Sequence, residues 1–260
     1  MLATVMVLPL VDGIFPALVL AGALSSATGI FEVGLLVFGG SATMAVILAE
    51  MDGTPREQAK AVLAVGVVLV TLASLEAALA PTIASVLKLA TFERFAALVI
   101  AAVAAKTASA RVGEYLPRPA VIVILGLVAS LDPAGATLTV RPDFALIARA
   151  VAAALVGTSF ALTVALAGPR LRKLVDIDRF RFGSAVALGL LPLSILGLPV
   201  GGAPLAVIAV TGLFALDPGS DGRTEASVED SPAVTDGGRE SDEETTGNET
   251  ESPVDRAPWL

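Results

Sequence analysis

The feature that most constrains this chain is a succession of apolar stretches, each close to the length of a membrane-spanning helix. A helix needs about 20 predominantly apolar residues to cross the hydrocarbon core of a bilayer. Eight stretches approach that length, at 3–24, 29–50, 58–81, 95–113, 119–138, 144–168, 182–198 and 203–217. Their apolar residues run in near-continuous blocks, and the mean hydropathy of the chain is +0.82. We therefore expect an all-α, polytopic transmembrane helix bundle of about eight spans.

The first and last of these stretches leave alternatives open. The stretch 203–217 is short, so seven full spans are the alternative if that segment is re-entrant or packed in the interior. The stretch 3–24 could be a signal peptide, because Ala21-Gly22-Ala23 resembles a cleavage site. A signal peptide begins with a basic region, however, whereas this stretch has none and its apolar core is interrupted by Asp12. We therefore interpret it as the first span.

The charged residues separate a nearly balanced membrane part from a strongly acidic end. Residues 1–216 contain 14 Lys+Arg and 12 Asp+Glu, whereas residues 217–260 contain 3 and 13. Ten basic residues lie in or beside the loops after the second, fourth and sixth stretches, against three beside the odd-numbered loops. Because cytoplasmic loops are enriched in Lys and Arg, we expect a multi-pass protein of the cell membrane with both termini in the cytoplasm.

The acidic end differs in composition from everything before it. Residues 218–260 are rich in Gly, Ser, Thr, Asp and Glu, so we expect a disordered acidic cytoplasmic tail, with a solvated extension favoured over an interaction tail. Only 4 of the 17 basic residues of the chain are Lys, and an Arg-rich, acid-tailed composition is typical of a halophile. The membrane part has no basic face, so we expect no nucleic-acid partner.

Similar residues recur at similar spacing and suggest an internal duplication. Asp12 and Asp132 are 120 residues apart, Gly40-Ser41-Ala42-Thr43 and Gly157-Thr158-Ser159 are 117 apart, and Gly66 and Gly189 are 123 apart. Two four-helix halves, 1–113 and 114–217, would account for these matches as parallel repeats. Chance similarity is the alternative, because small residues are common in membrane helices.

Asp12 is the first candidate for a functional group. An ionisable residue at membrane depth is costly and usually marks a proton relay, an ion site or a solute pathway. Pro16 has no N–H, so the carbonyl of Asp12 loses its helical hydrogen-bond donor. The sequence thus predicts a carboxylate and a loose carbonyl on one turn, suited to a proton or to Na⁺. The alternative is that Asp12 bonds to a neighbouring helix and that Pro16 only kinks the span.

The other acids in apolar stretches differ in their settings. Asp132 precedes Pro133, which disfavours helical angles at Asp132, so this acid either lines the same pathway or ends a helix. Glu76 lies deep in the third stretch and is the candidate for a third site carboxylate. Glu32 lies only three residues into its stretch, so we expect it to reach toward an outer interface.

Small and hydroxyl residues complete the candidate site. Gly40, Ser41 and Thr43 lie in the second stretch, and Thr158 and Ser159 lie in the sixth. Glycine permits close approach of helices, and hydroxyls bond across them, so packing alone explains these residues unless they face the acids.

The residue types that are missing exclude several kinds of chemistry. The chain has no Cys and no His, which removes disulfides, haem ligation by these residues, and zinc sites built on thiolate or imidazole. The Gly-x-Gly-Asp context of an intramembrane aspartyl protease is missing at both Asp12 and Asp132. We expect no enzymatic activity and no cofactor. The expected partners are the lipid bilayer and a small solute or monovalent cation, H⁺ or Na⁺.

The run Val7–Gly22, followed by Gly34-Leu-Leu-Val-Phe-Gly-Gly-Ser-Ala-Thr-Met-Ala-Val, resembles an uncharacterised haloarchaeal family of polytopic membrane proteins. More remotely, an Asp or Pro motif in the first helix of two halves is similar to the superfamily of LysE-type exporters and tellurium- or cadmium-resistance proteins. This resemblance implies secondary transport or export, with a non-transporting membrane scaffold or salt-stress protein as the alternative.

Overall fold

The computed structural model describes residues 1–132 and 142–216. Pro133 and the expected tail at 218–260 lie outside the described residues. Within these ranges the regular elements are all helical, and extended pairing is limited to two isolated bridges, Leu87–Leu131 and Val175–Leu216. The expected all-α class is confirmed for this part of the chain.

The first group of helices comprises short elements that follow one another closely. They are α1 (Leu2–Val11), α2 (Ile14–Leu20), α3 (Ala27–Val33), the π-helix η1 (Gly34–Phe38), α4 (Ser41–Ala45) and the π-helix η2 (Val46–Glu50). The longer helices follow: α5 (Pro55–Ala84), α6 (Leu89–Ala108), α7 (Ala110–Tyr115), α8 (Pro119–Ser130), α9 (Phe144–Leu174), α10 (Ile177–Ile195) and α11 (Ala203–Phe214).

Two to four segments are long and apolar enough to cross a membrane. The helices α5 and α9 meet this condition alone, with 30 and 31 residues. Two further spans result if each bent pair is one span: α1 with α2, bent by 43°, and α3–η1 with α4–η2, bent by 46°. The apolar helices α8 and α11 have only 12 residues each. The expected eight spans are therefore not confirmed.

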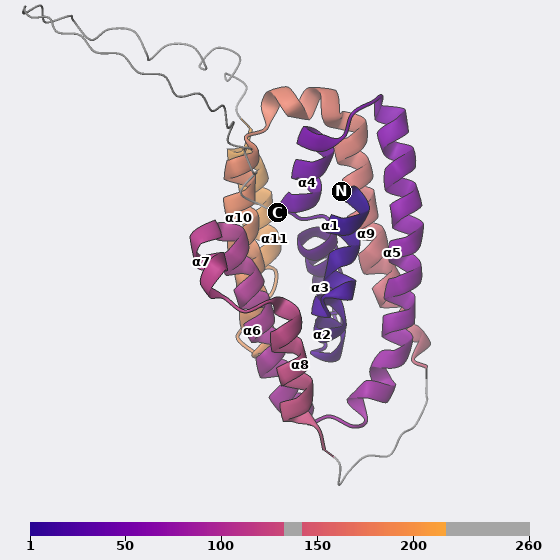
Figure 1. Cartoon of the computed structure of the whole chain (residues 1–260), viewed down its shortest axis with the longest axis vertical. Helices are drawn as coiled ribbons and strands as arrows, with labels where there is room; N and C mark the ends of the chain where they lie inside the picture. The colour runs from indigo at the N-terminus through magenta and orange to yellow at the C-terminus, as the bar shows by residue number, and fades with distance from the viewer. Residues whose placement is uncertain (133–141, 217–260) are drawn as a thin grey trace, which may run out of the picture.

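The short helices lie at the centre of the bundle. Figure 1 shows α1 to α4 between the pair α5–α9 on one side and α6, α8, α10 and α11 on the other. The first bent pair packs on α5, α6 and α8, and the second packs on α9, α10 and α11. The two bent helices are thus held inside the bundle by the longer ones.

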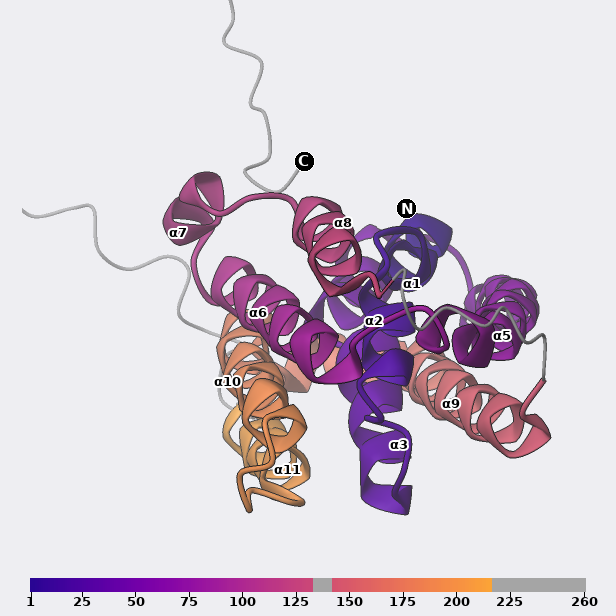
Figure 2. The ribbon, with the colours of Figure 1, turned by 90° about the horizontal axis from the view of Figure 1, so that it is seen from below.

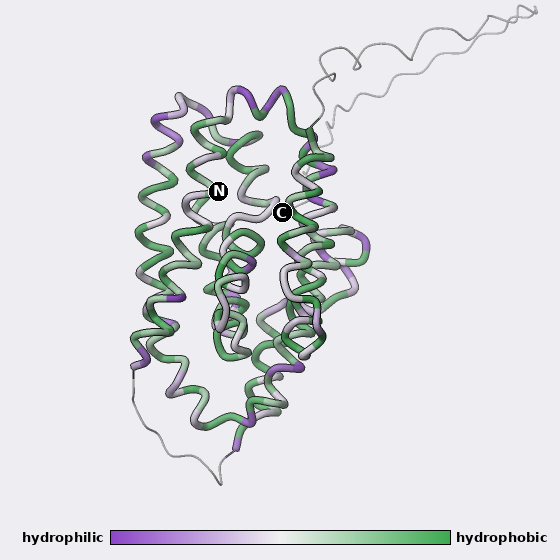
Figure 3. The backbone as a smooth tube through the Cα atoms, turned by 180° about the vertical axis from the view of Figure 1, so that it is seen from behind, coloured by the Kyte–Doolittle hydropathy of each residue, from purple (hydrophilic) through white to green (hydrophobic). Residues whose placement is uncertain are grey.

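The buried side of α5 is made mostly of small residues, and its exposed side carries large apolar ones. The buried side of α5 includes Gly66, Ala73 and Ala77, and this side packs on α9. Its exposed side includes Val67 and Leu75. Small residues allow membrane helices to approach closely, and exposed apolar side chains are stable against lipid. In Figure 3 the backbone of the long helices is mainly green, which marks apolar residues, and the purple, hydrophilic segments lie mainly near the helix ends.

The two halves expected from a duplication have different structures. The glycine break of the second stretch separates η1 from α4, whereas its counterpart in the sixth stretch, Gly157, lies inside the continuous helix α9. Gly66 lies in a helix of 30 residues, and its counterpart Gly189 lies in one of 19. The duplication is not confirmed.

Candidate functional site

The first break in the centre of the bundle is at Asp12 and Gly13. Asp12 ends α1, where its backbone N–H donates to the Leu8 carbonyl at 2.8 Å. Gly13 follows with φ of +76°, in the left-handed region that favours glycine. A Cβ on Gly13 would lie 3.1 Å from Val123 Cγ1 of α8, so the turn is also tightly packed. Both the backbone angle and the packing explain why α1 and α2 do not form one straight helix.

The Asp12 carboxylate lies at the edge of this break. The side chain is half-buried, next to the exposed Val11 and the buried Leu10. Pro16 lies in the first turn of α2 and has no N–H to offer to the Asp12 carbonyl. The break therefore brings together a carboxylate and a carbonyl without its usual helical donor.

The second break is at Gly39 and Gly40, between η1 and α4. The π-helix η1 ends at Phe38, and the Thr43 hydroxyl donates to the Phe38 carbonyl at 2.8 Å. Ser41 and Thr43 are both buried. Single-turn π-helices occur often at functional sites, and here one leads directly into a helix break lined by hydroxyl groups.

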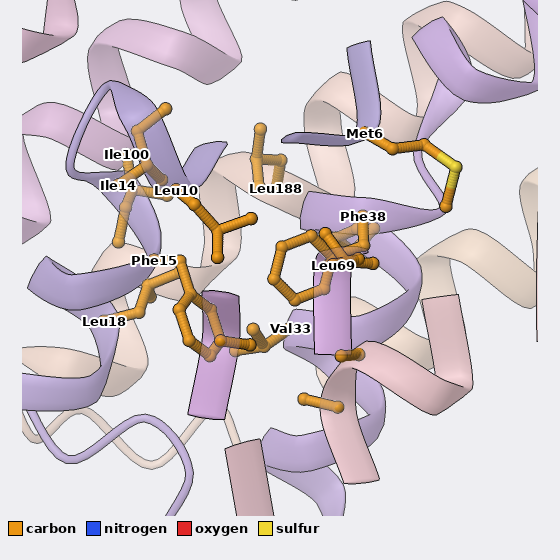
Figure 4. Close-up of a cluster of buried hydrophobic side chains, with 14 of the residues drawn as sticks. Met6, Leu10, Ile14, Phe15, Leu18, Val33, Phe38, Leu69, Ile100 and Leu188 are labelled. Atoms are coloured by element: carbon orange, nitrogen blue, oxygen red, sulfur yellow. The ribbon is translucent and has the colours of Figure 1, made fainter. Parts of the chain in front are cut away.

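The two breaks meet through a pair of aromatic rings. Phe15 follows the first break and Phe38 precedes the second, and their ring centroids are 5.0 Å apart with planes inclined by 45°. Figure 4 shows both rings within a cluster of buried apolar side chains that includes Leu10, Val33 and Leu69. The bent helices therefore touch at their breaks rather than only along their lengths.

Helix α9 packs directly against the second break. A Cβ on Gly157 would lie 2.5 Å from Phe38 Cβ and 2.8 Å from the Gly34 carbonyl oxygen. The next residue, Thr158, is buried on the side of α9 that faces α5. A Cβ on Gly66 of α5 would lie 2.5 Å from the Thr158 methyl carbon. The Thr158 hydroxyl donates to the Ala154 carbonyl at 2.8 Å. Thr158 thus faces α5 rather than the Gly39–Gly40 break, and Ser159 is exposed.

A hydroxyl of α10 also lies near this break. Ser184 is buried, and its Oγ would lie 4.0 Å from a Cβ on Gly40. Sequence reasoning missed this residue, because it lies 144 positions from Gly40 and has no acid beside it; its one signal was the preceding Gly183, which forms a Gly-Ser pair like Gly40-Ser41. Its contact with the break depends on how α10 packs on α4.

Asp132 lies apart from the two breaks. Its backbone N–H donates to the Val86 carbonyl at 2.9 Å, in an antiparallel bridge that joins the end of α8 to the α5–α6 loop. It lies beyond the end of α8 at Ser130, which is seven residues past Val123, the α8 residue that packs on Gly13, and seven residues correspond to about 10 Å of helical rise. The structure does not place the carboxylates of Asp12 and Asp132 together.

Two glutamates carry buried oxygens without partners. Within the described residues, Glu76 Oε2 and Glu32 Oε1 are buried side-chain oxygens with no hydrogen-bond donor. Glu76 is half-buried on α5, seven residues beyond the core residue Leu69, which is about 10 Å along the helix. Unsatisfied buried polar groups are rare, so each requires an explanation.

The expectation for Glu32 was wrong. The residue is only 4% exposed, so its carboxyl group is enclosed by protein rather than extended toward solvent. It is buried because α3 is covered by α9 and α11, and the Gly202 backbone, at the start of α11, bonds to its carboxyl group. The position of Glu32 near the start of an apolar stretch gave no indication of this cover.

One end of the second bent helix is held by two polar side chains. Arg172 of α9 donates from Nε to the Leu48 carbonyl at 2.7 Å and from Nη2 to the Met51 carbonyl at 3.0 Å. Gln58 of α5 is buried and also donates to the Met51 carbonyl, at 2.7 Å. These bonds satisfy carbonyls that a helix end leaves unpaired. In the sequence, Arg172 is only one of the basic residues that follow the sixth stretch.

Comparison with known proteins gives one match. Residues 69–196 match the model of a family of unknown function, DUF5794. The matched segment includes Glu76, Asp132 and Thr158 and excludes both breaks of the central helices. No curated protein and no solved structure matches the chain. The match supports similarity to an uncharacterised family and assigns no activity.

Proposed function

We propose that this protein is a multi-pass membrane protein that works as a secondary transporter or exporter of a small solute or monovalent cation. The observation that carries the proposal is the contact between two helix breaks, at Asp12–Gly13 and Gly39–Gly40, through Phe15 and Phe38. The resemblance of the first two stretches to haloarchaeal membrane proteins, and remotely to LysE-type exporters, agrees with it.

Broken helices at the centre of a membrane bundle favour transport for a physical reason. Hydrocarbon offers no partners to free backbone groups, so non-helical backbone at membrane depth is stable only inside protein or beside a water-filled cavity. Transporters bind substrates and coupling ions at such breaks, where carbonyls and N–H groups are available. Here the Gly39–Gly40 break packs against α9 and α10, and the Asp12–Gly13 break packs against α8 on one side.

The candidate residues receive different roles in this proposal. Asp12 provides negative charge at the first break, and Gly40, Ser41 and Thr43 provide backbone and hydroxyl oxygens at the second. The remaining described candidates, Glu76, Thr158, Ser159 and Asp132, lie further from the breaks and are assigned to the route by which a solute reaches them. Pro133, the last candidate, lies outside the described residues. A cation without most of its water needs several such oxygens.

The proposal includes the finer arrangement expected from the sequence. About eight segments cross the cell membrane, in two related halves, with both termini in the cytoplasm. Its support is the excess of Lys and Arg after the even-numbered stretches, to which Arg172 belongs. The two bent pairs then count as the first two crossings.

Flux measurements with one variant and one control test this function. The protein is reconstituted into liposomes with a pH-reporting dye, and proton and Na⁺ movements are followed under imposed gradients of either ion. We expect protein-dependent flux that Asp12→Asn abolishes, while Asp52→Asn, at an exposed loop position, leaves it unchanged. Equal flux in the wild type and Asp12→Asn would remove Asp12 from the mechanism, and no flux in the wild type would argue against ion-coupled transport.

One observation favours a second function, a non-transporting membrane scaffold. The side chains where the breaks meet, Phe15, Phe38, Val33 and Leu69, are fully buried and apolar. A scaffold needs only such a dry, packed core. The two functions differ in whether water reaches the breaks, which can be measured directly.

A further inference from the structure

Glu32 is held in surroundings that do not suit a permanently charged group. Its side chain is 4% exposed, and Oε1 is buried without a hydrogen-bond donor. It lies on α3 immediately before Val33, which is fully buried in the apolar core. An ionised carboxylate in such a place is costly, because burial removes its hydration and one oxygen gains nothing in return.

The other side of the same carboxyl group faces a helix N-terminus. Gly202, with φ of +78°, is the N-cap of α11, and its backbone N–H bonds to the Glu32 carboxyl. In the first turn of the 12-residue helix α11, the Ala203 N–H already donates to the Val200 carbonyl and Pro204 has no N–H, so the Gly202 N–H and the partial positive charge of the helix N-terminus are what stabilise a nearby anion. Figure 2 shows α3 between α9 and the α10–α11 pair, in agreement with the contacts of α3 with α9 and α11.

The elements packed on α3 bring no countercharge to Glu32. Neither η1 nor α11 contains a charged residue, and α3 contains none besides Glu32. The charged residues of α9 are Arg149, which is exposed, and three near its far end: Arg170, Arg172 and Lys173. Within the described residues, the α11 N-terminus is thus the stabilising feature for the charged form.

We propose that Glu32 is a reversible proton-binding site between α3 and the N-terminus of α11. Burial and the unpartnered Oε1 favour the protonated acid. The α11 N-terminus stabilises the carboxylate that remains when the proton leaves. The proton binds to a carboxylate oxygen of Glu32 and departs to water, and no other bond changes. Its role in coupling rests on the proposed transport function, whereas proton binding itself does not.

A proton fits this place better than a metal cation. Na⁺ and other hard cations require several oxygen ligands around them. Among the described residues, no group of three or more acidic side chains is placed to hold an ion together. A proton requires only the carboxyl group.

The first experiment measures protonation without measuring transport. Dicyclohexylcarbodiimide reacts with protonated carboxyl groups in apolar surroundings, and mass spectrometry of the full-length protein in detergent locates the label. We expect labelling of Glu32 that falls about tenfold for each pH unit above its pKa, and no labelling of the exposed Glu50. The proposal would be overturned if Glu32 remained unlabelled across the pH range. It would also be overturned if added Na⁺ protected Glu32 from labelling at constant pH, because such protection would indicate a cation site.

The second experiment separates this proposal from the transport function. Glu32→Gln imitates the protonated acid, and Glu50→Gln is the matched control. In liposomes we expect Glu32→Gln to abolish the pH dependence of flux and Glu50→Gln to preserve it. Unchanged pH dependence in Glu32→Gln would refute the coupling role. Labelling of Glu32 in a protein without any flux would uphold the proton site and refute the transport function alone.

Discussion

Replacement of Gly157 by alanine tests the contact between α9 and the second helix break. The new Cβ would lie 2.5 Å from Phe38 Cβ and 2.8 Å from the Gly34 carbonyl oxygen. Neither atom is the end of a flexible side chain, so α9 or the break must shift. Overpacking of this kind lowers the unfolding free energy by up to about 3 kcal/mol. The higher helix propensity of alanine restores about 1 kcal/mol of it. The expected net loss is about 2 kcal/mol of unfolding free energy.

Gly189→Ala is the matched control, because a Cβ there would lie 3.7 Å from its nearest neighbour, Ala104 Cβ. This variant should gain up to about 1 kcal/mol from helix propensity. Loss of helical circular dichroism on heating in detergent compares the two variants. Gly157→Ala should unfold at a lower temperature than the wild type and Gly189→Ala at the same or a higher one. Equal stability of the two variants would show that α9 does not touch the break as described.

Two further predictions concern helix ends. Arg172→Gln should lower the unfolding free energy by about 1.5–3 kcal/mol, since it loses charged hydrogen bonds to the end of η2. The control Arg170→Gln, at an exposed position, should change the unfolding free energy little. A similar effect of both variants in thermal unfolding would contradict the role of Arg172. Thr54→Ala should cost about 1 kcal/mol by the same measurement, because Thr54 caps α5 in a reciprocal pair with Glu57. Its control is Thr71→Ala on the exposed side of α5, and a larger loss there would contradict the capping role.

Local features of the fold could be predicted from the sequence. Long apolar blocks indicated helices, and α5 and α9 fill the third and sixth blocks. Asp12-Gly13 with Pro16 indicated a disturbed turn, and α1 ends there. These features depend on residues close together in the chain, whose backbone preferences act locally.

Features that depend on tertiary packing could not be predicted. Arg172 bonds to carbonyls 121 to 125 positions away. Glu32 is buried because α11 covers it, and Ser184 lies near Gly40 because α10 packs on α4. No local pattern marks such contacts, so the candidate site from sequence included Asp132, which lies elsewhere, and omitted Glu32.

Access of water to the second break is the most direct test of the central claim. The chain has no cysteine, so Ser41→Cys introduces a single thiol at the break, with Asp52→Cys as an exposed control and Ala161→Cys as a fully buried one. The rate of reaction with a membrane-impermeant thiol reagent is measured in liposomes. If the breaks form a transport site, Ser41→Cys will react from one side of the membrane, far faster than Ala161→Cys. A rate as slow as that of Ala161→Cys would show a dry core and contradict the account.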